Sequence, residues 1–266
     1  METDRADLER AIAFEDWVGD QLIDKRVPFP GGLGLFATKF PVIWDANKLL
    51  VQEASGMTAE DLAAEAERLH SAEGHEHRAI SMSDPDLSMT YGDEFAELGW
   101  KVDRFVVMAH RGDPPPLSGD TEVHELTAEA MRDVRSKVIG EQPYGQKPEV
   151  VAQLLDIDVV LRDAIAIRFF GASTGGTIGS ICELYSDGKT AQIEDVATLK
   201  EHRKKGLARA LLAQVLDLVY REEHDFVFLV ADEEDWPKDF YAGMGFVPIG
   251  RYQRFLRPGG VDFVSE

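Results

Sequence analysis

The sequence predicts a layered α/β (α+β) protein made of two halves with the same order of elements. Apolar, strand-like runs alternate with amphipathic helical stretches, which is typical of helices packed on a sheet. A proline-rich segment, Arg111–Asp120, divides the chain, because its three prolines remove backbone donors and disfavour both helix and central strand. We therefore expect two domains, residues 1–112 and 120–266.

Composition limits the classes of partner. The chain has 266 residues, with 28 basic and 49 acidic side chains, and its formal charge is −21. A nucleic-acid partner is not expected, because phosphate binding needs a basic face. A membrane partner is not expected either, since no apolar run is long enough to cross a bilayer. A single cysteine, Cys182, excludes an internal disulfide framework. The acidic N-terminal segment lacks an apolar signal region, so we predict a cytoplasmic protein.

The second half contains most of the clearly patterned elements. Leu207, Leu211, Val215 and Val219 recur every four residues, which predicts a helix with one buried face. The run Phe226–Val230 is apolar throughout, as in a strand covered on both faces. The strands expected in this half are 122–126, 164–171, 177–184, 190–199, 226–230 and 247–256. The helices expected are 129–138, 148–156, 206–220 and a short one from about 235 to 243 or 245.

One strand has an irregular pattern. Ile193 is at an odd position and Val196 at an even one, so the apolar alternation changes parity between them. Either a β-bulge or a loose alternation in a short strand explains this change.

The first half repeats the order of the second. Gly99–Trp100 and Gly245–Phe246 are 146 positions apart, and the same offset places Ala59–Leu62 beside Lys205–Ala208. The matching strands are 48–52, 78–83 and 102–108, with a helix over 58–70, and we expect a further strand near 35–40. We interpret the first half as a duplicate that has lost a binding turn. Chance spacing between two α/β halves is the alternative.

That turn is the strongest functional signal. A strand ending in Val196–Thr198 leads into the basic segment Arg203–Arg209, where a helix begins. Backbone N–H groups and the positive end of the helix dipole meet there, and four basic side chains surround the same point. Gly206 lets the backbone approach a phosphate closely. The glycine spacing fits neither the P-loop nor the dinucleotide fingerprint. The segment therefore predicts a polyanion site, with a pyrophosphate as the natural ligand.

Two motifs in this half resemble a known family. The segment Arg203–Ala208 fits the pattern Arg/Gln-x-x-Gly-x-Gly/Ala, and Phe240–Phe246 is similar to Leu-Tyr-x-x-x-Gly-Phe. Both patterns are those of the GNAT superfamily of acyl-CoA N-acyltransferases, and the resemblance covers about residues 122–256. The first half is similar to the degenerate repeat of tandem GNAT proteins. The resemblance implies two tandem GNAT-like domains, each with a mixed, mostly antiparallel sheet flanked by helices.

The resemblance also implies an activity and a cofactor site. The chain would transfer an acetyl group from acetyl-CoA to a primary amine of a small molecule or peptide, by direct attack, as a monomer or homodimer. The strand residues would bind the pantetheine arm, the turn would bind the pyrophosphate, and Tyr241 would also contact the cofactor. The residues assigned to acetyl-CoA in this way are Val196, Ala197, Thr198, Arg203, Lys204, Lys205, Gly206, Leu207, Ala208 and Arg209.

The same resemblance implies catalytic roles. Tyr241 matches the family's general acid, whereas the aligned residue of the first half, Phe95, has no proton to give. We choose Glu194 as the general base, with Asp195 and Glu183 as alternatives, because all three lie on or beside the strand before the turn. Two other functions stay open: a non-catalytic acyl-CoA sensor, and a nucleotide-binding regulator that would bind ATP instead of acetyl-CoA.

A metal site is not predicted. His75 and His77 flank Glu76, but no third or fourth ligand is evident, and a polar turn before Arg78 explains the pair.

Overall fold

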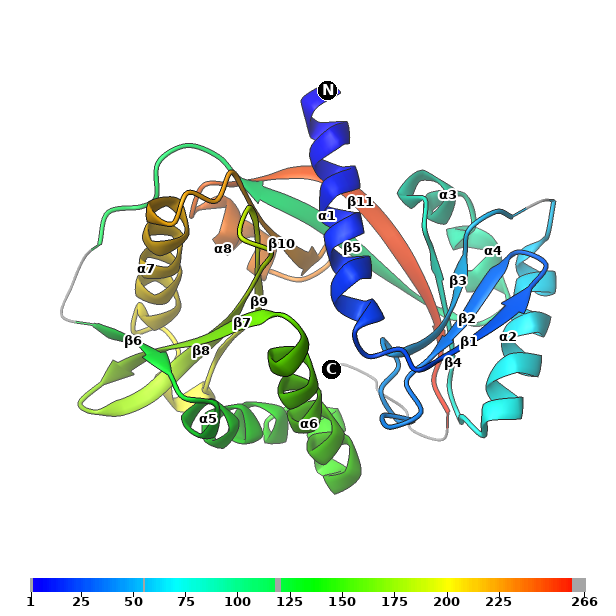
Figure 1. Cartoon of the computed structure of the whole chain (residues 1–266), viewed down its shortest axis with the longest axis horizontal. Helices are drawn as coiled ribbons and strands as arrows, with labels where there is room; N and C mark the ends of the chain where they lie inside the picture. The colour runs from blue at the N-terminus through cyan, green and yellow to red at the C-terminus, as the bar shows by residue number, and fades with distance from the viewer. Residues whose placement is uncertain (1, 55, 118–120, 260–266) are drawn as a thin grey trace.

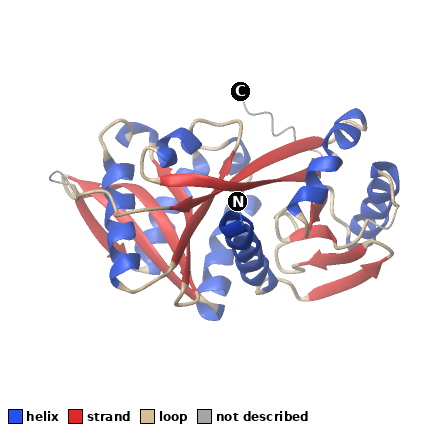
Figure 2. Ribbon diagram, turned by 90° about the horizontal axis from the view of Figure 1, so that it is seen from above, coloured by secondary structure: helices blue, strands red, loops and turns tan. Residues whose placement is uncertain are grey.

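The computed structural model describes residues 2–54, 56–117 and 121–259. Its centre is one mixed sheet of eleven strands that runs through the whole molecule, with helices packed on both faces (Figures 1 and 2). The predicted fold class is confirmed: the pairs β3–β4 and β9–β10 are parallel and all other pairs in the described sheet are antiparallel. No helix in the described part of the chain is long and apolar enough to span a membrane.

The elements follow the predicted order in both halves. Those before the proline-rich segment are α1 Glu2–Asp20, β1 Lys25–Phe29, β2 Gly32–Phe36, β3 Asn47–Val51, α2 Ala59–Glu73, β4 Arg78–Met82, α3 Pro85–Thr90, α4 Gly92–Glu97 and β5 Lys101–His110. Those after it are β6 Glu122–Leu126, α5 Ala128–Gly140, η1 Pro143–Gln146, α6 Pro148–Ala164, β7 Ala166–Thr174, β8 Thr177–Ser186, β9 Thr190–Thr198, η2 Lys200–His202, α7 Leu207–Arg221, β10 Phe226–Asp232, α8 Pro237–Ala242 and β11 Phe246–Arg257.

The two halves exchange their last strands. The strand order is β1-β2-β3-β4-β11-β5-β10-β9-β8-β7-β6. The first half's last strand, β5, thus pairs with β10 of the second half, while β11 pairs with β4 of the first half. The longest pairing in the sheet joins the two exchanged strands, from Phe246 opposite His110 to Leu256 opposite Lys101. The boundary predicted at residues 112–120 falls between β5 and β6, and residues 118–120 lie outside the described part.

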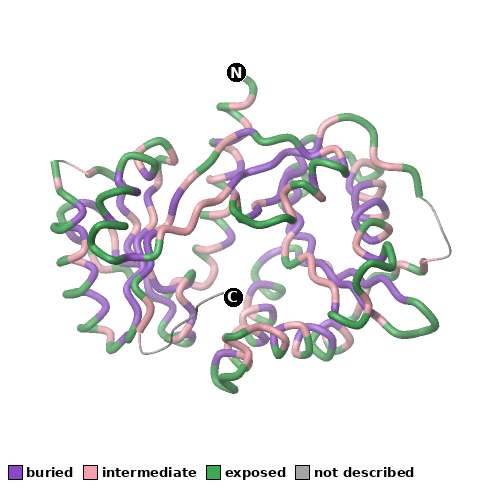
Figure 3. The backbone as a smooth tube through the Cα atoms, turned by 180° about the vertical axis from the view of Figure 1, so that it is seen from behind, coloured by how far each residue is buried: buried purple, intermediate pink, exposed green. Residues whose placement is uncertain are grey.

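Separate apolar clusters hold the helices on the sheet. Leu207, Leu211, Val215 and Val219 of α7 are at most 1 % exposed, so the predicted helix stripe is confirmed as a core face. Helices α1, α5 and α6 contribute to a second cluster on the other face, which includes Phe228 of β10. Helix α2 packs on the strands of the first half in a third cluster. Figure 3 shows these buried segments as continuous stretches along the strands and the inner helix faces.

The duplication is visible in matched backbone hydrogen bonds. The N–H of Gly99 donates to Ala96 O at 2.9 Å, and the N–H of Gly245 donates to Ala242 O at 3.2 Å. Both glycines have positive φ, 76° and 95°, which an L side chain rarely adopts. Each glycine follows a short helix and precedes an exchanged strand, which agrees with the 146-residue offset.

Two local expectations were wrong, and two elements were not predicted. The strand expected near 35–40 is β2, Gly32–Phe36, because Gly32 and Gly34 pair with β3 instead of forming a loop. The helix expected to end at 156 continues to Ala164, since Leu155 and Leu161 are buried against the sheet. The pattern also gave no signal for α1 or β1; α1 is long, but its stripe of Leu8, Ala11 and Phe14 is narrow.

Candidate active site

The strand before the basic turn carries a β-bulge. In the pairing of β8 with β9, Ile181 lies opposite Ala197 and Glu183 opposite Glu194, so β9 has one extra residue between these pairs. Asp195 in this interval has φ 50°, outside the usual range for a strand. The bulge is therefore the correct explanation of the parity change. Bulges redirect the side chains beside them, which here are those of Glu194 and Asp195.

Strands β9 and β10 separate next to this bulge. They pair in parallel over Thr190–Gln192, opposite Phe226–Phe228, and then diverge. Beyond this point β9 stays with β8 as far as Thr198, and β10 pairs with β5 as far as Asp232. The separation leaves one side of β9 without a strand partner at Val196–Thr198.

Backbone orientation distinguishes the three predicted pantetheine residues. The N–H of Leu199 donates to Gly179 O at 3.0 Å. Because antiparallel pairs alternate, Ala197 also faces β8, whereas Val196 and Thr198 turn their backbone groups to the open side. The carbonyl of Ala197 accepts a further hydrogen bond from Ser180 Oγ at 2.9 Å. The open side is thus formed by the backbone of Val196 and Thr198.

The basic turn presents backbone amides at an uncapped helix end. Lys204 has φ 61° and Gly206 has φ 81°, and α7 starts at the next residue. No side chain caps α7, so its first N–H groups have no partner within the helix. The side chains of Arg203, Lys204, Lys205 and Arg209 are exposed, and none of them forms an ion pair within the described residues. Leu207 is buried under the turn and Ala208 is half-buried. The Nε of Arg203 donates to Thr198 O at 3.1 Å, which ties the turn to the end of β9.

Arg135 forms ion pairs with two of the three candidate bases. Arg135 of α5 is almost completely buried, and its guanidinium pairs with Glu183 and, at 2.5 Å, with Asp195. It also pairs with Asp158 of α6 at 2.8 Å. Glu183 is 0 % exposed, and one of its oxygens accepts a hydrogen bond from Tyr185 Oη at 2.7 Å. Glu183 and Asp195 are therefore engaged in holding α5, α6 and the bulge together.

The remaining candidate, Glu194, has a different environment. It is half-buried and forms no ion pair with a cation among the described residues; Gln192 Nε2 donates to its Oε1 at 2.6 Å. Burial raises the pKa of Glu194 to about 8, and the nearby charges of Asp195 and Glu15 act in the same direction. A carboxyl group with a pKa near the working pH is suited to accept a proton.

Tyr241 is held on α8 beside the same strand. It is 8 % exposed and packs against Phe240 and Phe246, with ring centroids 5.5 and 6.1 Å apart. Burial, followed by the negative charge of Glu194, raises the pKa of its hydroxyl above the ordinary value. The hydroxyl therefore stays protonated at neutral pH, as a proton donor must.

Helix α1 adds a residue that the sequence did not indicate. The helix crosses the centre of the molecule in front of β5 and β11 (Figure 1). Its Glu15 accepts a hydrogen bond from Tyr252 Oη of β11 at 3.4 Å. Burial raises the pKa of Glu15 to about 7, against the lowering effect of Arg254. No local motif marks Glu15 or Arg135, because only the tertiary fold brings them to β9.

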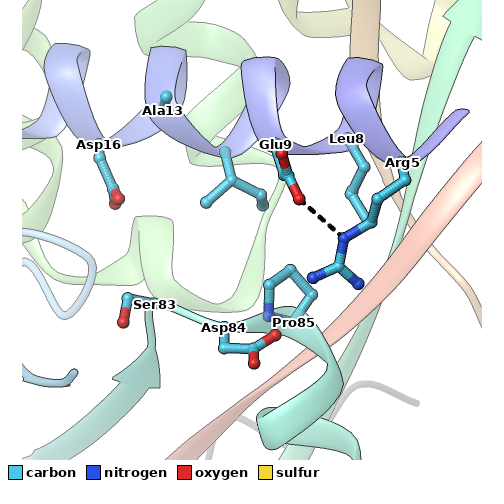
Figure 4. Close-up of a pocket in the computed structure, with 9 residues that line it drawn as sticks. Arg5, Leu8, Glu9, Ala13, Asp16, Ser83, Asp84 and Pro85 are labelled. Atoms are coloured by element: carbon cyan, nitrogen blue, oxygen red, sulfur yellow. Dashed lines mark hydrogen bonds and ion pairs between the residues drawn. The ribbon is translucent and has the colours of Figure 1, made fainter. Parts of the chain in front are cut away.

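A separate cavity lies between α1 and the first half. It has a volume of about 330 Å³ and separates α1 from the turn between β4 and α3 (Figure 4). Glu9 and Asp16 line one wall, and Asp84 lines the other. None of its lining residues belongs to β9, α7 or α8, so it holds no predicted site residue.

A bulged strand, a diverging parallel strand pair and an uncapped helix end thus lie next to one another in the second half. Residues 166–248 match the model of the acetyltransferase (GNAT) domain. This segment runs from β7 to the start of β11 and includes the bulge, the basic turn and Tyr241. The second half of the chain accordingly contains a GNAT domain.

Solved structures share the fold over nearly the whole chain. A conserved protein of unknown function from Staphylococcus epidermidis has TM-score 0.68 and 15% identity, with 89% of this chain and 95% of that chain covered. A GCN5-related N-acetyltransferase from Kribbella flavida has TM-score 0.65 and 15% identity, with 95% and 96% covered. A tandem GNAT protein from the clavulanic acid biosynthesis pathway has TM-score 0.55 and 17% identity, with 80% and 74% covered. No curated protein matches the sequence significantly.

Proposed function

We propose that the chain transfers an acetyl group from acetyl-CoA to a primary amine by direct attack of the amine. The observation that carries this proposal is the separation of β9 from β10 beside the uncapped, basic N terminus of α7. An extended chain with amides fits the open side of β9, and a pyrophosphate fits the free N–H groups of α7. The GNAT domain supports acyl-CoA acyltransfer in general; the acetyl donor and the amine acceptor are the finer part of the proposal.

The residues that would hold acetyl-CoA form one continuous surface. The backbone of Val196 and Thr198 would bind the pantetheine amides, while Ala197 keeps its place in the β8–β9 ladder. The amides from Arg203 to Arg209 would bind the pyrophosphate, with the exposed cations around it. Acetyl-CoA would supply an acyl group activated as a thioester.

Glu194 is our candidate for the base. A protonated amine cannot attack, so its extra proton must be removed, and Glu194 in its ionised form would accept it. The pKa near 8 makes the ionised fraction rise with pH through that value. Asp195 and Glu183 are weaker candidates, because each already forms an ion pair with Arg135.

Tyr241 is our candidate for the acid. As the nitrogen–carbon bond forms, the carbon–sulfur bond breaks and leaves a thiolate. The Tyr241 hydroxyl would protonate this sulfur. Tyr241 lies close enough to Glu194 for their charges to interact, so the proton-accepting and proton-donating groups occupy the same site.

The charge of the site favours a cationic acceptor. The negative charges of Asp195 and Glu15 both act on Glu194 and raise its pKa. Such a field attracts ammonium groups and repels anions. We therefore propose a small-molecule or peptide amine as the acceptor, in a monomeric or homodimeric cytoplasmic enzyme without a nucleic-acid or membrane partner.

The test combines binding with turnover. Calorimetry measures acetyl-CoA and ATP binding, and a thiol-release assay screens a panel of amines. We expect acetyl-CoA binding, no ATP binding, and thiol release that depends on an amine. In Tyr241→Phe we expect kcat to fall about 100-fold with the Kd for acetyl-CoA unchanged.

The control is Tyr91→Phe, which removes a buried tyrosine hydroxyl of the first half that donates to Met57 O at 2.7 Å. Its kcat should equal that of the wild type. Acetyl-CoA binding without turnover on any amine would favour the sensor instead, and unchanged turnover in Tyr241→Phe would remove the acid role. ATP binding without acetyl-CoA binding would favour the nucleotide-binding regulator.

A further inference from the structure

Three histidines of the first half meet in its core. His70 lies in the last turn of α2, and His75 and His77 lie in the connection to β4. They are 0 %, 8 % and 3 % exposed. One ring nitrogen from each lies within 4.8 Å of the others, and the ring centroids are 5.1–5.3 Å apart. In the sequence no third ligand is evident beside His75 and His77. In the fold, His70 in the last turn of α2 takes that position.

The closest pair of ring nitrogens is spaced as two ligands of one ion would be. The Nδ1 atoms of His70 and His75 are 3.1 Å apart. Two imidazole ligands of a tetrahedral Zn²⁺, each bonded at about 2.0–2.1 Å, place their nitrogens roughly 3.3 Å apart. A change of a few tenths of an ångström would therefore bring both nitrogens to an ion.

The outer nitrogens of two rings are held by the backbone. His77 Nε2 lies 3.2 Å from Asn47 O, and since a carbonyl can only accept, this nitrogen carries the proton. The lone pair of His77 is then on Nδ1. His70 Nε2 lies 3.4 Å from both the O and the N of Ala79, which fixes the ring with its Nδ1 toward His75. Backbone carbonyls commonly orient the histidines of metal sites in this way.

The connection that carries His75 and His77 is also rigid. Gly74, with φ 77°, ends α2, and the N–H of His75 donates back to His70 O at 2.9 Å. Arg78 Nη1 donates to His75 O at 2.6 Å and to His77 O at 2.9 Å. Glu67 pairs with Arg78 at 2.7 Å, which offsets part of the positive charge beside the histidines.

Aromatic rings enclose the cluster. Phe36 packs against His70 and His75, each at 5.5 Å between centroids. Trp44 packs against His77 at 6.2 Å between centroids. The three imidazoles are therefore shielded from solvent.

The second half offers a contrast. The connection between α7 and β10 contains one buried histidine, His224. Its Nδ1 lies 3.0 Å from Val219 O, and its Nε2 lies 2.7 Å from Ser186 Oγ. Both ring nitrogens of His224 thus have ordinary partners, as expected of a structural histidine. The nitrogens of the first half converge on one another instead.

We propose that His70, His75 and His77 bind one divalent transition-metal ion, Zn²⁺ by their ligand chemistry, which fastens the α2–β4 connection of the first half. Three imidazoles suit Zn²⁺, and a water molecule can complete the tetrahedron. The ion would stabilise a half that lacks the acyl-CoA site, so its role is independent of acetyl transfer.

The test uses the full chain after treatment with a chelator. Titration with Zn²⁺ should give one equivalent bound, and one equivalent of Co²⁺ should give the visible absorption of a tetrahedral site. At a free Zn²⁺ concentration about 100 times the Kd, the melting temperature should rise on the order of 5 °C. His75→Ala and His77→Ala should each abolish all three signals.

The matched control is His124→Ala, which removes an exposed histidine of the second half. It should bind Zn²⁺ as the wild type does. The proposal is overturned if the wild type binds no stoichiometric Zn²⁺, or if His75→Ala binds it with unchanged affinity, which would place the ion on the acidic surface. The wild-type measurements decide the question even if a variant does not fold. None of these three signals depends on acetyl transfer, so the proposed enzyme activity is tested separately.

Discussion

Helices α2 and α7 occupy equivalent places in the two halves, but their N termini differ. In α2, Thr58 Oγ1 accepts from the N–H of Asp61 at 3.2 Å, and Asp61 accepts in return from the N–H of Thr58 at 2.9 Å. The N–H of Ala59 donates to a carboxylate oxygen of Glu94 at 3.3 Å, which adds a third side-chain contact. In α7 no side chain takes these positions. The first half therefore satisfies its helix end internally, and the second leaves it free for an external anion.

The two parallel strand pairs also differ: the pair in the first half stays closed, and the pair in the second half opens. Strands β3 and β4 stay paired to their last residues, Val51 opposite Met82, and the N–H of Ser83 then donates to Val51 O at 2.9 Å. Strands β9 and β10 part after Gln192 and Phe228. The two halves thus differ at this place without a change of architecture: the first has a closed strand pair and a self-capped helix, and the second has neither.

The largest effect on the open half is expected from Glu194→Gln. Wild-type kcat/KM should rise with pH through about 8, because only the ionised carboxylate can accept a proton. The variant should lose about 100-fold in kcat/KM at high pH and should lose this rise. The measurement is a pH profile on an amine whose own pKa is below about 7, so that substrate ionisation does not mask the enzyme group. Glu97→Gln, on an exposed position of the first half, is the control, and a profile unchanged in Glu194→Gln would assign the base elsewhere.

A smaller effect is expected when acidic side chains, like those at the N terminus of α2, are placed at the N terminus of α7. The double variant Lys204→Glu/Lys205→Glu should raise the Kd for acetyl-CoA roughly 10- to 100-fold, since it places two anions where the pyrophosphate would bind. Calorimetry at several salt concentrations checks this, because a charge effect weakens as salt increases. Lys39→Glu/Lys189→Glu changes the net charge equally at other exposed lysines and should leave the Kd unchanged. Equal Kd values for the two double variants would contradict the pyrophosphate assignment.

The smallest effect is expected from a change at the capped N terminus of α2. Thr58→Ala removes the cap of α2 and should lower the free energy of unfolding by about 1 kcal/mol. Urea denaturation measures this change. Acetyl-CoA binding should not respond, and a change in its Kd would mean that the first half takes part in cofactor binding after all.

Much of this contrast was predictable from sequence. Gly206, its basic neighbours and the absence of an equivalent glycine at Glu60 are local features, and so is the parity change that marks the bulge. The environment of Glu194 was not predictable, because it depends on Glu15 of α1 and on Arg135 of α5, which lie far away in sequence. The strand exchange was also invisible, since β5 and β11 have the same pattern whichever half they join. The third histidine was missed because His70 reads as an ordinary helix residue.

The exchange of β5 and β11 has a consequence for how the chain reaches its native state. During synthesis the first half emerges with β4 and β5 already made, but the native neighbour of β4 is β11, which is made after all the other strands. Until then β4 presents an unpaired edge, and β5 lacks one of its two partners, the other being β10, which is made shortly before β11. Such a chain cannot complete one domain before starting the next, so both halves must reach their final form in one late, cooperative step.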